Sequence, residues 1–122
     1  MCIYRAGRLV HYTGFTPRYW RFPFLSQRDL LIGDSRTDPK HRGKRLASFA
    51  LQHILMMKRE QGRCFWYVVG NDNRASIRVA ERLQFGLAGV GRWRKPLGIK
   101  LLGSYVPDDD GEAWRVPVKQ TL

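Results

Sequence analysis

The stretch from Thr37 to Ala47 constrains the fold of this chain more than any other. It reads Thr-Asp-Pro-Lys-His-Arg-Gly-Lys-Arg-Leu-Ala and lies between the apolar run Leu30-Leu31-Ile32 and a helical pattern that begins near Lys44. A helix start offers free backbone N–H groups and the positive end of the helix dipole, which suits it to bind an anion. Gly43 allows the backbone to approach a ligand closely. We therefore expect a phosphate-bearing ligand at this helix start.

Two helical patterns and one apolar strand surround or follow this stretch. Residues 44–60 carry apolar side chains at helical spacing, and the predicted inner face consists of Leu46, Phe49, Ala50, His53, Ile54 and Met57. Residues 64–69 form a continuous apolar strand of the kind buried in a parallel sheet. Asn73 is expected to cap a helix over residues 74–84. Strand, helix and strand in this order predict a parallel crossover within a mixed sheet.

The remaining segments predict further strands on both sides of this unit. Residues 2–15 read as a hairpin that turns at residues 6–8, with His11 on its surface. Other strands are expected over the aromatic residues 18–25, and over residues 90–94 and 99–105. From Pro107 the chain is first acidic, and we expect a loosely ordered tail. The predicted organisation is one domain over residues 1–106 and a C-terminal tail over residues 107–122.

The basic stretch resembles the acetyl-CoA loop of the GCN5-related N-acetyltransferase (GNAT) family, which reads roughly Val-x-Pro-x-x-Arg-Gly-x-Gly-x-Gly/Ala. The residues that fit this pattern are Thr37, Pro39, Arg42, Gly43 and Ala47. Arg45 departs from it, because the pattern has a glycine there. Residues 73–85 are similar to a second block of the family, Asn-x-x-Ser … Glu-Lys-Leu-Gly-Phe, with Gln84 in place of the glycine.

The resemblance extends over about residues 30–105 and implies a fold class. This is an α/β (mixed α+β) fold whose mixed, mostly antiparallel sheet contains a central strand–helix–strand cofactor-binding unit. The family fold usually begins with one further strand and two helices that help to form the acceptor side of the cleft. Those elements have no counterpart in the sequence, so we expect an N-terminally shortened member of the family.

The resemblance also implies an activity, the transfer of an acetyl group from acetyl-CoA directly to an amine. The residues that it implies for acetyl-CoA binding are Thr37, Arg42, Gly43, Lys44, Arg45, Leu46, Ala47, Asn73 and Ser76. Many family members use a tyrosine in the second block as the general acid, and the matching residue here is Ala80. Ser76 or water would then protonate the leaving thiolate, and Asp34 could accept the amine proton through water. The alternatives are a plain N-cap for Asn73, a solvent-facing Ser76 and an exposed strand-end carboxylate for Asp34.

Charge and composition restrict the partners. The net charge of +12 implies anionic partners such as CoA, nucleotides, nucleic acid or an acidic surface. No apolar run approaches the ~20 residues that span a membrane, and the N-terminus lacks the apolar segment of a signal peptide. Cys2 and Cys64 provide no disulfide framework, which indicates reduced thiols in the cytoplasm. No His/Cys cluster has metal-ligand spacing, so we expect no metal.

Three functions remain open from the sequence. The first is an N-acetyltransferase that acts on the amine of a small molecule or peptide. The second is a catalytically weak CoA-binding module, which Arg45 and Ala80 would favour. The third is a nucleic-acid-binding protein, which we expect least because the basic residues concentrate in a cofactor-like loop rather than among stacking aromatics. A short N-terminus would leave sheet edge and apolar surface uncovered, so we also expect a homodimer.

Overall fold

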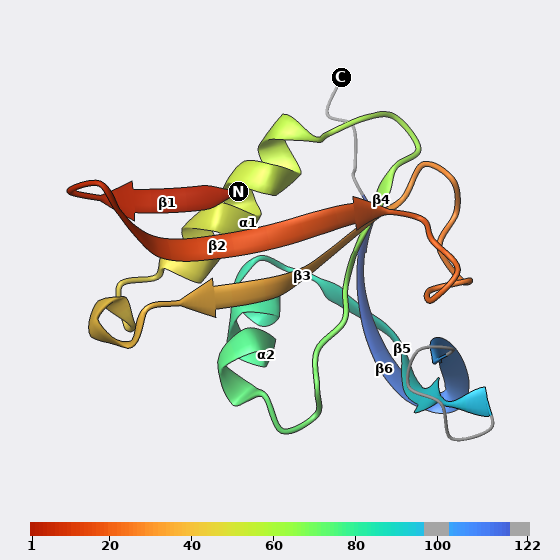
Figure 1. Cartoon of the computed structure of the whole chain (residues 1–122). Helices are drawn as coiled ribbons and strands as arrows, with labels where there is room; N and C mark the ends of the chain where they lie inside the picture. Colours follow the sequence, from red (N-terminus) through yellow and green to blue (C-terminus); the bar gives the residue numbers. More distant parts are fainter. Residues whose placement is uncertain (97–102, 118–122) are drawn as a thin grey trace.

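A computed structural model describes residues 1–96 and 103–117 of the chain (Figure 1). The sheet has the strand order β1-β2-β3-β4-β6-β5. Among the described strands only β3 and β4 run parallel to each other, and the other neighbouring pairs are antiparallel. The elements are β1 Cys2–Arg5, β2 Arg8–Pro17, β3 Leu30–Thr37, the 3-10 turn η1 Pro39–His41, α1 Leu46–Met57, β4 Cys64–Tyr67, α2 Arg74–Arg82, β5 Gly86–Arg94 and β6 Ser104–Pro117. This mixed α+β architecture confirms the predicted fold class.

The hairpin, the crossover and the cap of the second helix follow local sequence signals. Ala6 and Gly7 both have positive φ, at 48° and 73°, as a tight two-residue turn between twisted strands requires. The apolar run Leu30-Leu31-Ile32 before the basic stretch forms the first part of β3. The α1 crossover between β3 and β4 is present, and Asn73 is the N-cap of α2.

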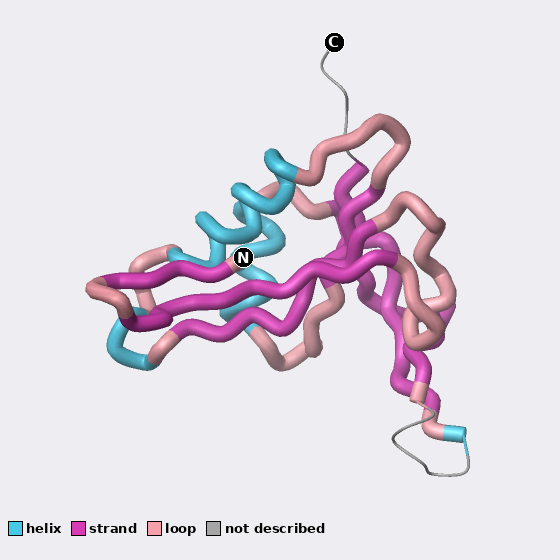
Figure 2. The backbone as a smooth tube through the Cα atoms, turned by 45° about the horizontal axis from the view of Figure 1, so that its top comes forward, coloured by secondary structure: helices cyan, strands magenta, loops and turns pink. Residues whose placement is uncertain are grey.

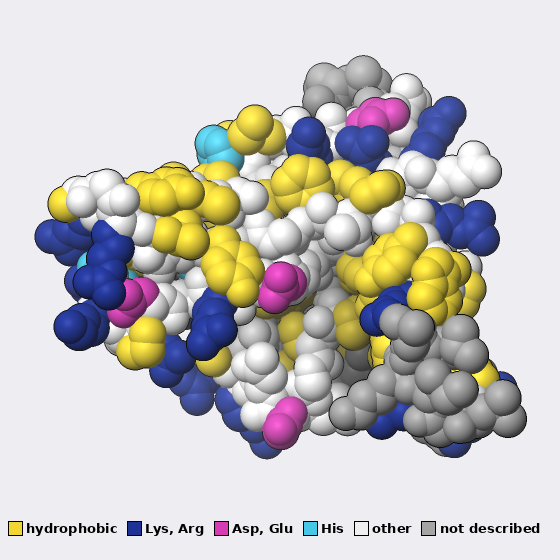
Figure 3. Space-filling model, in the orientation of Figure 1, with side chains coloured by type: hydrophobic (Ala, Val, Ile, Leu, Met, Phe, Trp, Pro, Cys, Tyr) yellow, Lys and Arg dark blue, Asp and Glu magenta, His cyan; other side chains and the backbone are white. Residues whose placement is uncertain are grey.

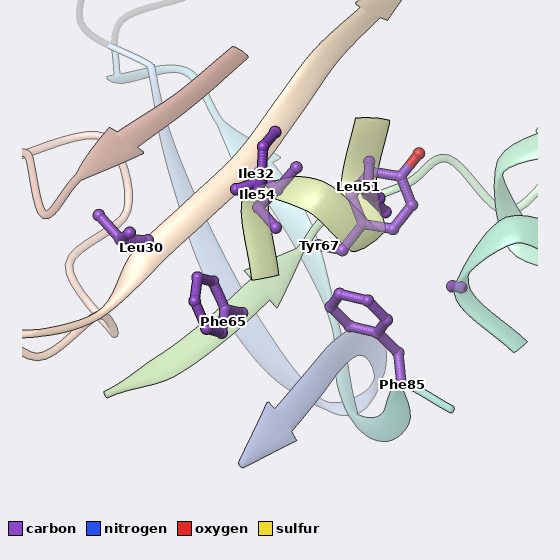
Figure 4. Close-up of a cluster of buried hydrophobic side chains, with 8 residues drawn as sticks. Leu30, Ile32, Leu51, Ile54, Phe65, Tyr67 and Phe85 are labelled. Carbon is purple, nitrogen blue, oxygen red and sulfur yellow. The ribbon is translucent and has the colours of Figure 1, made fainter. Parts of the chain in front are cut away.

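The hydrophobic core lies between the helices and one face of the central strands. Leu30 and Ile32 of β3 pair with Phe65 and Tyr67 of β4, so these side chains share one face. Leu51 and Ile54 of α1, Ala80 of α2 and Phe85 join them in one buried cluster (Figure 4). Because both helices contribute to the same cluster, they cover the same face of the sheet.

Residues 18–29 cover the opposite face, and the expected strand over residues 18–25 is wrong. Proline at positions 17 and 23 removes two backbone donors, and the chain instead makes turns in which the Phe22 N–H donates to the Tyr19 carbonyl. The Phe24 ring packs 4.8 Å from Trp66 and 5.7 Å from Tyr105, centroid to centroid. Aromatic packing, rather than strand pairing, therefore holds this segment on the sheet.

The first helix is shorter than its apolar pattern indicates. It starts at Leu46 rather than 44, because Arg45 lies in the left-handed region at φ 58° and cannot belong to a right-handed helix. Its buried face consists of Ser48, Ala50, Leu51 and Ile54. Phe49 and Met57, which we expected inside, are 56% and 67% exposed. The buried stripe is thus rotated toward Leu51, and apolar side chains remain on the solvent face.

The expectation of a loosely ordered tail from Pro107 is wrong for residues 107–117, and the proposed division at residue 106 falls inside a strand. These residues continue β6, which pairs with β5 on one side and with β4 on the other. The backbone hydrogen bonds of two neighbouring strands fix this segment despite its acidic composition. Residues 99–102 of the last predicted strand and residues 118–122 lie outside the described part of the chain.

Figure 2 shows the β5–β6 pair running away from the strands β1 to β3, so the sheet is strongly twisted at its centre.

In residues 1–96 and 103–117, no helix has the length and apolar character needed to cross a bilayer. The same residues contain no cluster of three or more His, Cys, Asp or Glu side chains placed to hold a metal ion.

Candidate functional site

A cleft opens where β3 and β4 separate. The two strands pair only at Leu30–Phe65, Leu31–Trp66 and Ile32–Tyr67, and β3 then continues alone to Thr37. The cleft has a volume of about 560 Å³ and is lined by β3, the following loop, the start of α1, Tyr67 and α2. Parallel strands that part at their carboxyl ends are a common place for ligands in α/β sheets.

The lining of the cleft is strongly basic. Of the lining residues, six are cationic and none is a carboxylate; the cations are Arg36, Arg42, Lys44, Arg45, Arg78 and Arg82. They come from β3, the loop and α2, which surround the cleft on different sides. Lys and Arg side chains also gather at the end of the molecule near η1 (Figure 3). Such a lining favours a ligand with several negative charges.

The loop before α1 presents its backbone to this cleft. The Asp38 carboxylate accepts a hydrogen bond of 2.9 Å from the Lys40 N–H and so fixes the turn η1. Gly43 and Arg45 both have positive φ, at 74° and 58°. Arg45 is the N-cap residue of α1, and its side chain makes no capping hydrogen bond. The first N–H groups of α1 therefore lack this cap and can donate to a ligand.

All nine residues that the resemblance implied for cofactor binding line this cleft. They come from the end of β3, the loop and the first turns of both helices. Asp34 is placed differently: it is exposed, does not line the cleft and lies at a β-bulge with φ 47°. The structure thus brings together the nine residues expected to bind the cofactor, and leaves the expected base outside the group.

Asn73 and Ser76 connect the cleft to the start of α2. The Asn73 side-chain oxygen accepts a 3.1 Å hydrogen bond from the Ser76 N–H, which is the N-cap interaction. Both residues also line the cleft. Capping and proximity to a ligand are therefore compatible roles for Asn73.

Tyr67 was not expected at the site from the sequence, because it lies in the apolar run of β4 and reads as a core residue. Its side chain is only 3% exposed, yet it lines the cleft and hydrogen-bonds to the Ser76 side chain. Burial raises the pKa of the Tyr67 phenol, and the hydrogen bond with Ser76 opposes part of that rise. Its neighbourhood to Ser76 depends on the packing of α2 on β4, which no local pattern encodes.

A second feature that the sequence did not indicate is a series of hydrogen-bonded polar side chains that runs from the buried residues His11 and Thr13 to the cleft wall. His11 was expected on the strand surface, but it is 1% exposed. Its Nδ1 lies 2.7 Å from Thr37 Oγ1 and its Nε2 lies 2.8 Å from Thr13 Oγ1. Thr13 Oγ1 in turn lies 2.8 Å from Ser35 Oγ. Because Thr37 and Ser35 line the cleft, these hydrogen bonds to β2 hold that part of β3 in place.

We expect His11 to make folding stability fall as the pH drops below neutrality. Burial lowers the pKa of His11 below 6.5, and the positive Met1 ammonium adds to this effect. Below that pH the unfolded chain binds a proton that the folded chain excludes, so stability is full above about 6.5 and declines toward the lower folded-state pKa. Chemical denaturation at several pH values between 8 and 5 should show a decline that His11→Asn reduces. An equal decline in both proteins would contradict this prediction.

Arg45→Gly is expected to stabilise the fold by about 0.5–1 kcal/mol, because glycine adopts the left-handed conformation without the penalty that a side chain carries. Affinity for CoA should stay similar or fall slightly, by less than about fivefold, since one cation is lost. Lys44→Gly is the control, because it removes a neighbouring cation from a residue without positive φ and should lower stability. Calorimetry and denaturation measure both quantities. A large gain in affinity would mean that Arg45 blocks the cleft.

The model of the Acetyltransferase (GNAT) family matches residues 1–85. No curated protein matches the chain in sequence. Among solved structures, the ribosomal-protein-S18-alanine N-acetyltransferase from Escherichia coli superposes with a TM-score of 0.66 at 18% identity, over 97% of this chain and 67% of that chain.

Two further structures are similar. An N-acetyltransferase from Staphylococcus aureus Mu50 has a TM-score of 0.68 at 19% identity, over 97% of this chain and 66% of that chain. The Salmonella typhimurium protein yncA, solved with its cofactor acetyl-CoA, has a TM-score of 0.66 at 17% identity, over 98% of this chain and 64% of that chain. The chain thus spans about two thirds of the length of these structures, and at such identities the likeness shows the fold.

Proposed function

Because the chain belongs to the GNAT acetyltransferase family, we propose that it transfers an acetyl group from acetyl-CoA to the amine of a small molecule or peptide. The observation that carries this proposal is the helix start without a side-chain cap from Arg45, beside a cleft with six cations and no carboxylate in its lining. A diphosphate ligand matches both the free N–H groups and the positive charge.

The residues of the cleft fit CoA in shape as well as in charge. A Cβ atom placed on Gly43 would have no heavy atom within 4 Å, so the space in front of this backbone is open. The N–H groups of the loop and of the first turn of α1, between Arg42 and Ala47, would hold the diphosphate. The backbone near Thr37 would contact the pantetheine arm, because the Thr37 hydroxyl is engaged by His11.

Acetyl-CoA supplies a thioester that an amine can attack directly. The protein would position this thioester in the cleft where β3 leaves β4, and bring the amine to it from the open side. Neither free cysteine lines the cleft, which supports direct transfer without an acyl-cysteine intermediate. For proton removal from the amine we propose Asp34, acting through water from its exposed position beside the cleft residue Ser35.

The free thiols Cys2 and Cys64 are compatible with a reducing compartment, and we place the protein in the cytoplasm on that ground.

Calorimetry with acetyl-CoA, CoA and pantetheine tests this proposal. Pantetheine lacks the phosphates, so it should bind much more weakly than CoA if the basic loop and helix start form the binding site. Mass spectrometry of a panel of small amines and peptides, incubated with acetyl-CoA, would then identify acetylated products. Binding without transfer to any amine would favour the CoA-binding module, and tight binding of nucleic acid at physiological salt without CoA binding would contradict the proposal.

We also propose that the protein forms a homodimer through the solvent face of α1 and the free edge of β1. On α1, Phe49, Met56 and Met57 are 56%, 70% and 67% exposed, and β1 is an edge strand of the sheet. A second copy would cover these side chains at a gain of roughly 25 cal/mol per Å². The charge of +12 on each chain opposes association, so light scattering should find more dimer as the salt concentration rises. A monomer mass at every salt and protein concentration would rule this out.

A further inference from the structure

The proposed reaction produces a CoA thiolate, and the position of Tyr67 suggests how it is protonated. Tyr67 is the last residue of β4 and pairs with Ile32 at the point where β3 and β4 separate. Its ring packs on Phe85 with a centroid distance of 5.8 Å. Figure 4 shows the phenol oxygen at the edge of the buried cluster, pointing away from the other labelled side chains. The core thus holds the ring, and Tyr67 belongs to the cleft lining.

The Tyr67 hydroxyl has a fixed partner. Ser76 hydrogen-bonds to it from α2, and the backbone of Ser76 is itself held by the Asn73 cap at 3.1 Å. Because the N-cap sets the first turn of α2, the backbone that carries the Ser76 hydroxyl is held in place. Ser76 also lines the cleft and can exchange a proton with solvent there.

His41 and Lys44 belong to the loop that is proposed to hold the diphosphate, and among the other lining residues Tyr67 is the best proton donor. The hydroxyls of serine and threonine are far too weak as acids, and arginine does not release its proton. A phenol has an ordinary pKa of about 10 and a thiol of about 8.5. Because burial raises the pKa of Tyr67, the phenol keeps its proton at neutral pH and is available to hydrogen-bond to a thiolate. The charged side chains that line the cleft are cations, which come from α2, β3 and the loop: Arg78, Arg82, Arg36, Arg42, Lys44 and Arg45. They stabilise a thiolate whether or not Tyr67 is present.

We propose, on the basis of the acetyltransferase function above, that Tyr67 is the catalytic residue that protonates the leaving CoA thiolate. As the bond between the amine nitrogen and the carbonyl carbon forms, the carbon–sulfur bond breaks and its electron pair stays on sulfur. Tyr67 gives its proton to that sulfur. The phenolate regains a proton from the Ser76 hydroxyl, which is reprotonated by solvent, and the proton lost by the amine passes to water. Proton and electron counts balance without an additional reactant.

The test is the thiol pKa of bound CoA, which needs no acceptor. CoA labelled with ¹³C at the carbon next to sulfur is titrated by NMR in the presence of saturating protein. A hydrogen bond from the phenol stabilises the thiolate, so Tyr67→Phe should raise the thiol pKa by about one unit, a tenfold change in the ionisation constant. Affinity for CoA at low pH, where the thiol is protonated in every protein, should change less than about threefold.

Tyr4→Phe provides the matched control, since this tyrosine is 64% exposed on β1 and does not line the cleft. It should leave the thiol pKa of bound CoA unchanged. Fluorotyrosine incorporated at position 67 keeps the size of the ring and makes the phenol more acidic, so it should lower the thiol pKa below the wild-type value even if Tyr67→Phe does not fold. An equal thiol pKa in wild type and in the position-67 variants, with CoA bound, would overturn this role. Failure of wild type to bind CoA would instead overturn the proposed function.

Discussion

Gly43→Asp is expected to weaken CoA binding by roughly 30-fold or more. Gly43 precedes α1 in the loop that lines the cleft, and the space that a side chain would enter there is open. The new carboxylate would stand where the diphosphate is proposed to bind, and repulsion of about 2 kcal/mol or more follows at an effective dielectric constant near 20. Calorimetry at constant ionic strength measures the change.

Gly43→Asn is the matched control for this experiment. Asparagine has the shape of aspartate without its charge, and it tolerates a positive φ, here 74°, better than most residues. We expect its affinity for CoA to stay within about threefold of wild type. If the aspartate variant bound CoA as tightly as the asparagine variant, the diphosphate would not lie at this loop and the assignment of the site would be wrong.

Asp29→Asn is expected to reduce folding stability by about 3 kcal/mol. The Asp29 carboxylate is 4% exposed and accepts three hydrogen bonds, from the Ser26 N–H at 2.9 Å, the Cys64 N–H at 3.1 Å and Trp66 Nε1 at 2.8 Å. An amide offers one oxygen and one NH₂ group, so at least one of these donors would face another donor and remain unpaired. Hydrogen bonds to a charged group contribute about 1.5–3 kcal/mol each, and an unpaired buried donor adds a further cost.

Urea denaturation of Asp29→Asn beside Glu81→Gln separates this effect from simple loss of charge. Glu81 is exposed on α2, and the same carboxylate-to-amide change there should cost less than about 0.5 kcal/mol. Burial raises the pKa of Asp29, but the hydrogen bonds from Ser26, Trp66 and Cys64 outweigh burial and lower it below 3.8. The contribution of Asp29 is therefore present above about pH 3.8 and is lost as the pH falls through the folded-state pKa. Equal stability losses in the two variants would refute this view of Asp29.

The parts of the fold that the sequence predicted correctly are those encoded by neighbouring residues. Ala6-Gly7 specify a tight turn, Asn73 specifies a helix start, and the loop after Thr37 gathers its charge within a few positions. In each case the residues that determine the structure also form it. The basic loop before α1 could therefore be placed before any tertiary contact was known.

The errors concern residues whose environment comes from distant segments. Residues 18–25 have the composition of a strand, yet their rings pack on Trp66 and Tyr105 instead of joining the sheet. His11 has no apolar neighbour pattern that predicts burial, and its partners Thr37 and Ser35 reach it only through strand pairing. Tyr67 reads as a core residue in the sequence, and only its contact with Ser76 reveals the polar hydroxyl at the cleft.

The position of β6 affects the order in which this protein can fold during synthesis. The N-terminal part of the chain leaves the ribosome first, so β1 to β4 and both helices emerge well before residues 104–117. Until then the outer edge of β4 has no partner and β5 has no neighbour in the sheet, because β6 lies between them. A nascent chain thus exposes strand edges that favour pairing with other chains. The need for chaperones should be greatest in this interval. Removing the residues from Pro107 onward would take away part of an interior strand rather than a dispensable tail.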